Sequence, residues 1–108
     1  MSENNNRNKD IEAAVIIQTI TDAVQNCYGV YGLSDRVSDR KGFVSQGIVL
    51  QRHPDRHLSV EIYLVVSSEV KITEVLREAQ NQLYFVLNKN FPRLFRSIDV
   101  FADYSMPR

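Results

Sequence analysis

Few residues of this chain are suited to catalysis, and no catalytic arrangement is visible among them. Cys27 is the only thiol, and it lies on the apolar side of a predicted helix, near its C-terminal end. A catalytic cysteine needs a lowered pKa, which a helix N-terminus or a neighbouring base supplies. A helix C-terminus has the opposite dipole and disfavours a thiolate. We therefore expect Cys27 to be a core residue rather than a nucleophile.

The only two histidines, His53 and His57, flank a Pro-Asp-Arg segment. Two imidazoles and the Asp55 carboxylate are potential zinc ligands, but a structural zinc site usually has four. A spacing of four residues places both histidines on one side only in a helix, and Pro-Asp is a turn signal. We interpret residues 53–57 as the polar tip of a β-hairpin, with a metal site as the alternative.

Two further patterns carry little chemical specificity. Glu61, Asp99 and Asp103 are predicted on one sheet face, without a histidine or nucleophile beside them for acid–base work. Gly29-Val30-Tyr31-Gly32 has the G-x-x-G letters of a KH loop, which clamps nucleic acid, but it contains no basic residue. No P-loop, dinucleotide fingerprint or nucleophile elbow occurs. The sequence therefore predicts no enzyme, no catalytic residue, no metal and no cofactor.

The composition indicates one domain. The chain has 108 residues, of which 44% are hydrophobic, and this is enough for a single core. Its thirteen basic and thirteen acidic residues give zero net charge, so nucleic acid is not an expected partner. No apolar run approaches the roughly 18 residues of a membrane span, and a single cysteine fits a cytoplasmic location. Residues 1–9 are polar, and we expect a disordered tail before a domain at residues 10–106.

The hydrophobic pattern predicts which elements position these residues. A first helix is expected from Asp10, as its cap, to about Asn26. A second helix, capped by Ser67 or Ser68, is expected to run to about Lys89. The predicted strands are residues 28–33, 43–52, 58–66 and 98–104. The order α-β-β-β-α-β indicates an α+β two-layer sandwich, with a mixed sheet of three to four strands and two helices packed on one face.

Alternation along these strands divides their side chains between two faces of the sheet. The face toward the helices is predicted to carry Ile48, Leu50, Leu58, Val60, Ile62, Leu64, Val66, Ile98, Val100, Ala102 and Tyr104. Four apolar residues on the reverse face form what we call the outer cluster: Val49, Tyr63, Val65 and Phe101. An exposed cluster of this kind often marks a protein interface. Scattered apolar residues on a solvated sheet are the alternative.

Four segments carry a resemblance to a known family. They are Gly29-Val30-Tyr31-Gly32-Leu33, the strand at residues 58–66, the helix that begins Val70-Lys71-Ile72-Thr73-Glu74-Val75, and the strand at residues 98–104. In this order and spacing they resemble the alkaline shock protein family, also called the envelope stress response family, of Gram-positive bacteria and mycoplasmas. The resemblance covers residues 10–106.

This resemblance implies a non-enzymatic cytoplasmic protein linked to homeostasis of the cell envelope. It also implies a protein partner anchored in the membrane, and self-association into a homo-oligomer. The leading hypothesis is a scaffold that associates through the outer cluster or an exposed strand edge. The alternative hypothesis is a small RNA- or ribosome-associated module, whose candidate contacts are the loop residues Arg36, Arg40, Lys41, Arg52 and Arg56.

Overall fold

The computed structural model describes residues 2–35, 43–45 and 47–106, and the side chains of residues 12–35 and 47–103 among them. Its elements are α1 (Ser2–Val24), β1 (Val30–Leu33), β2 (Phe43–Ser45), β3 (Ile48–Arg52), β4 (Leu58–Ser67), α2 (Ile72–Asn90) and β5 (Phe95–Met106). The α+β class and the predicted order are confirmed. The predicted strand at residues 43–52 is divided into β2 and β3, so the mixed sheet has five strands.

Strand β4 lies inside the sheet and has paired strands along both of its edges. Along one edge it pairs antiparallel with β3 and then with β1, and along its other edge it pairs in parallel with β5. The two edge partners meet at Tyr63. Its backbone N–H donates to the Gly47 carbonyl at 2.7 Å, and its carbonyl accepts from the Ser34 N–H at 2.8 Å. A β carbon on Gly47 would lie 2.8 Å from the Ser34 carbonyl oxygen, so this junction requires glycine.

The core lies between the sheet and both helices. Burial alternates along the first part of β4, as the sequence predicts for a strand with one covered face. The predicted inner-face residues from Ile48 to Ala102 are buried or pack against the buried cluster, together with one side of each helix. The Tyr104 side chain lies outside the described residues. The helices contribute chiefly Ala13, Ile16, Ile20, Val24, Val75, Ala79, Leu83 and Leu87.

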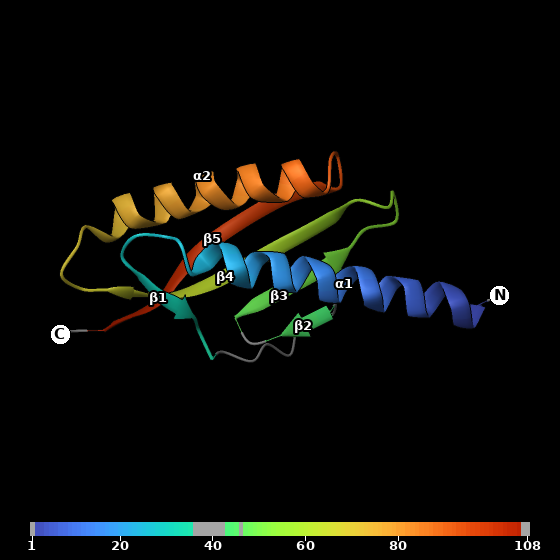
Figure 1. The fold of residues 1–108 in the computed structure, drawn as a ribbon, viewed down its shortest axis with the longest axis horizontal. Helices are drawn as coiled ribbons and strands as arrows, with labels where there is room; N and C mark the ends of the chain where they lie inside the picture. Colours follow the sequence, from blue (N-terminus) through green and yellow to red (C-terminus); the bar gives the residue numbers. More distant parts are fainter. Residues whose placement is uncertain (1, 36–42, 46, 107–108) are drawn as a thin grey trace.

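Both helix starts differ from the prediction. The tail predicted as disordered is helical from Ser2, and Figure 1 shows α1 extending past the sheet toward the N-terminus. Residues 2–9 contain no proline or glycine, and extending an existing helix costs far less than nucleating one. Helix α2 begins at Ile72, and its cap residue Lys71 makes no side-chain capping bond. Ser67 instead accepts the Glu69 N–H within the preceding turn, at 3.2 Å.

Candidate functional site

The reverse face of the sheet carries a stacked pair of aromatic rings. Tyr63 on β4 and Phe101 on β5 are direct neighbours in the parallel register. Their ring centroids are 5.2 Å apart, and the ring planes differ by 22°. Phe101 is 42% exposed, and Tyr63 is half-buried. We call these two residues the ring pair.

The other two members of the outer cluster are not exposed. Val49 and Val65 are 2% and 6% exposed, and neither belongs to the core beneath the helices. Each lies on a strand that has paired neighbours on both sides, whereas Phe101 lies on the edge strand β5. The prediction of a four-residue exposed cluster is therefore wrong for Val49 and Val65. The apolar surface that the outer cluster exposes is the ring pair.

Acidic side chains lie around the ring pair. The Tyr63 hydroxyl donates to Glu61 at 2.9 Å, and Glu61 is the register neighbour of Asp99. Asp103 accepts a hydrogen bond from the Ser34 hydroxyl. Of the three carboxylates predicted on one face, Glu61 is thus in direct contact with the ring pair. Among the described residues no group of His, Cys, Asp and Glu side chains is arranged to hold a metal ion.

A glutamine that sequence reasoning missed covers part of the β5 edge. The Gln80 side-chain amide on α2 donates to the Ile98 carbonyl and accepts the Val100 N–H at 3.1 Å. These are the backbone groups that an added strand would use. The only signal in the sequence is a polar residue beside the apolar stripe of α2, next to the buried Ala79.

The two histidines have separate partners in the hairpin. His53 Nε2 lies 2.6 Å from the Ser59 hydroxyl oxygen, and His57 Nδ1 lies 3.2 Å from the Asp55 carboxylate. The backbone N–H of His57 donates to Asp55 and is the main cause of the lowered pKa of that carboxyl group. The hairpin prediction is confirmed, since His53 and His57 pair through the backbone at 2.9 Å.

The candidate RNA contacts do not form a continuous track in the described part of the chain. Arg52 forms an ion pair with Glu12 of α1 at 3.0 Å. Arg56 is exposed at the hairpin tip. Arg36, Arg40 and Lys41 lie outside the described residues.

Cys27 is buried, and its thiol contacts the Ala23 carbonyl at 3.5 Å, as expected for a core cysteine. Burial raises the pKa of this thiol, which disfavours the thiolate. Among the described residues, none of the helices has both the length and the apolar character that a membrane crossing requires.

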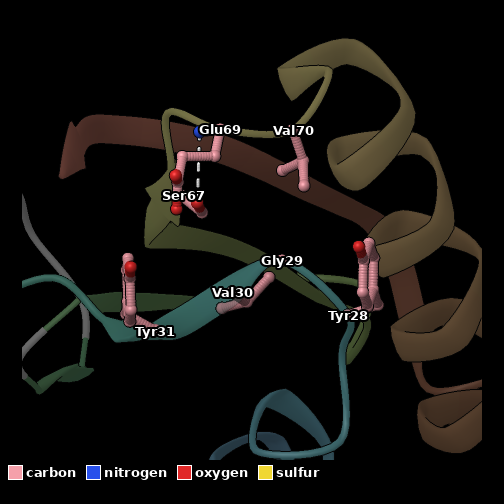
Figure 2. A pocket seen from close by; sticks show the side chains of 7 residues that line it. All are labelled: Tyr28, Gly29, Val30, Tyr31, Ser67, Glu69 and Val70. Atoms are coloured by element: carbon pink, nitrogen blue, oxygen red, sulfur yellow. Dashed lines mark hydrogen bonds between the residues drawn. The ribbon is translucent and has the colours of Figure 1, made fainter. Parts of the chain in front are cut away.

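An open groove of about 490 Å³ lies where the start of β1 meets the segment after β4. It is lined by Tyr28, Gly29, Val30, Tyr31, Ser67, Glu69 and Val70 (Figure 2). The G-x-x-G segment noted in the sequence thus contributes most of one side. The other side comes from residues almost forty positions later, which is why sequence reasoning did not find the groove.

No family model matches the chain. An uncharacterized protein of Bacillus subtilis (strain 168), YloU, is 24% identical over 102 residues, which cover 87% of this chain and 84% of YloU. Among solved structures, a MamM CTD variant in its manganese form has a TM-score of 0.55 at 15% identity, covering 85% of this chain and 98% of that chain. Another MamM CTD variant has a TM-score of 0.57 at 12% identity, covering 89% and 95%. The likeness to these structures is one of fold.

Proposed function

We propose that the chain is a non-enzymatic scaffold that associates with itself or with a protein partner through the ring pair. The observation that supports this proposal is a stacked aromatic pair on the face of the sheet that the helices leave uncovered. Aromatic residues in the centre of an interface carry much of the binding free energy. Phe101 retains 42% exposure even though it is stacked, so a partner would remove further apolar surface from water.

The ring pair is an anchor and not a whole interface. A stable interface buries about 800 Å² on each partner, which is several times the area of one aromatic side chain. The remainder would come from the polar surroundings, including Glu61 and Asp99. A binding surface with an aromatic centre and a polar rim is the usual anatomy of a non-obligate interface.

Association through the β5 edge is the less favoured mode. Gln80 already bonds the Ile98 carbonyl and the Val100 N–H. A strand added there would have to displace the glutamine side chain before it could form its own backbone bonds. The sheet face requires no such displacement.

We further propose a role in cell-envelope homeostasis, in the cytoplasm and next to the membrane through a membrane-anchored partner. The support for this finer proposal is the resemblance to the alkaline shock protein family. The similarity to YloU covers most of both chains and indicates a bacterial relative. YloU is uncharacterized, so the similarity does not indicate an activity. The alternative, an RNA-associated module, has weaker support because Arg52 is already paired with Glu12.

The proposal is tested by measuring molar mass with light scattering. We expect the double substitution Tyr63→Asp with Phe101→Asp to yield a folded monomer, because two charges would have to be buried in the interface. The matched control is Tyr84→Asp with Phe85→Asp, which changes two exposed aromatic residues on α2. The control should retain the mass of the unchanged chain.

Circular dichroism verifies that both double variants are folded. An unchanged mass in the Tyr63 and Phe101 variant would contradict the proposal, as would dissociation of the α2 control alone. If the unchanged chain is monomeric, the same two variants are compared for capture of a membrane-anchored partner. Equal capture by both would then overturn the proposal.

A further inference from the structure

The groove depends on two unusual backbone features in the segment that carries its tyrosines. Gly29 has a φ of 79°, and a β carbon there would lie 2.6 Å from Val75 Cγ2 of α2. The register of β1 against β4 then passes from Val30 directly to Gly32, so Tyr31 is the extra residue of a β-bulge. Bulges redirect side chains and occur often beside functional sites. Here the bulge directs an aromatic side chain to the groove.

The two tyrosines of the groove are both exposed, Tyr28 more than Tyr31. Tyr28 is 74% exposed and Tyr31 is 48% exposed. Figure 2 shows them on either side of Gly29 and Val30, with Glu69 and Val70 on the opposite side of the groove. The faces of aromatic rings carry negative charge density and attract cations.

The charge of the lining residues also favours a cation. Glu69 is the one charged residue among the seven that line the groove. Its backbone is held by the hydrogen bond to the Ser67 hydroxyl. A carboxylate in the same groove as two aromatic rings favours a cation and repels a phosphate. The lining of the groove therefore does not favour the phosphate backbone that a KH loop clamps.

We propose that the groove binds an arginine side chain of a protein partner. A guanidinium group is planar, stacks on aromatic faces and matches a carboxylate, and it is less strongly hydrated than an ammonium group. The volume of about 490 Å³ lies within the usual range of ligand sites and holds one long side chain with its adjoining backbone. The inference rests on the proposed function in that both involve a protein partner. None of the lining residues belongs to the ring pair.

The experiment is a titration of the isotope-labelled full chain, followed by NMR chemical shifts of its backbone amides. The probe is a blocked pentapeptide with one arginine between glycines. The matched probe replaces arginine with citrulline, which has nearly the same shape and no charge. We expect the arginine peptide to shift the amides of residues 28–32 and 67–70, and the citrulline peptide to leave them nearly unchanged.

Two variants and their matched controls connect the binding to the groove. Glu69→Gln should raise the dissociation constant about two- to fivefold, as for loss of a solvent-exposed ion pair. Tyr28→Ala should raise it by a similar factor through loss of a cation–π contact. Glu78→Gln and Tyr84→Ala change an exposed glutamate and an exposed tyrosine of α2, and should leave binding unchanged.

Several outcomes would overturn the inference. Equal shifts with the citrulline peptide would show that the positive charge plays no part in binding. Shifts confined to residues outside 28–32 and 67–70 would show that the peptide binds elsewhere. Binding of tetramethylammonium or phosphocholine without the arginine peptide would identify a lipid headgroup as the occupant instead. Light scattering keeps this test separate from the proposed function. If the peptide does not bind but Tyr63→Asp with Phe101→Asp still dissociates the assembly, only the groove proposal is contradicted. If the peptide binds but the double substitution leaves the mass unchanged, only the ring-pair proposal is contradicted.

Discussion

Gln80 accepts the backbone N–H of Val100 at 3.1 Å, and so a side chain of α2 occupies a place on β5 where another strand would bond. The same amide group also donates to the Ile98 carbonyl. A parallel strand at the edge of a sheet exposes such pairs at regular intervals and is prone to join other edges. Gln80 therefore protects the centre of this edge while it joins α2 to β5.

Replacing Gln80 with leucine should expose this edge and destabilise the fold. Two backbone groups would lose their partners, which costs about 1–3 kcal/mol for each one that stays buried. We expect a lower urea midpoint and faster aggregation on mild heating. Asn81→Leu is the matched control, because Asn81 is an exposed amide on the same helix, and it should change stability by no more than about 0.5 kcal/mol. Equal stability of the two variants would show that the Gln80 contacts contribute nothing.

Gly29→Ala should destabilise the chain through a clash with Val75. The new β carbon would lie 2.6 Å from Val75 Cγ2, and the φ of 79° is unfavourable for alanine. We expect a loss of about 1–3 kcal/mol in the free energy of unfolding. Chemical denaturation provides the measurement.

A double-mutant cycle separates the cost of the clash with Val75 from the cost of the positive φ at residue 29. In a Val75→Ala background, Gly29→Ala should cost less, because the methyl group that blocks the β carbon is gone. The residual cost then reports the unfavourable φ. Strict additivity of the two substitutions would rule out the clash.

Cys27 should make the chain less stable in alkaline solution. Burial raises the pKa of its thiol, so the folded chain keeps this proton to higher pH than the unfolded chain does. The contribution is therefore fully present below the unfolded pKa of about 8.5 and is lost as pH rises through the folded pKa. Between about pH 7 and pH 9.5, the free energy of unfolding should fall more in the unchanged chain than in Cys27→Ala. Parallel curves for the two proteins would contradict this sign.

The sequence predicts the helix-facing side of the sheet well, because strand period and burial coincide there. Ile62 and Leu64 are buried as their alternation requires, and Val60 is too. The reverse face is harder to predict from the same pattern. Val49, Val65 and Phe101 are all apolar there, and only the positions of neighbouring strands determine that the valines are covered. Exposure on an uncovered face depends on the sheet around a residue as well as on its own type.

Features that depend on contacts between distant segments were missed for a different reason. The Gln80 contact with β5 joins residues 18 and 20 positions apart on two elements, and a polar residue beside the apolar stripe of α2 does not reveal which backbone groups it bonds. The groove combines Tyr31 with Glu69, and the bulge that positions Tyr31 appears only once β1 is paired with β4. The α1 start was misjudged because a polar composition predicts little burial, whereas a helix that is already nucleated extends without burying anything.

The fluorescence of a Phe101→Trp variant tests most directly whether the ring pair becomes covered on association. The chain contains no tryptophan, so the new indole would be the only one. With Phe101 at 42% exposure, the dilute protein should emit as a partly solvated indole. We expect the emission to shift to shorter wavelength and to resist quenching by iodide as the chain assembles or as its partner is added. Emission that stays red-shifted and quenchable while light scattering records assembly would place the interface elsewhere and contradict an interface at the ring pair.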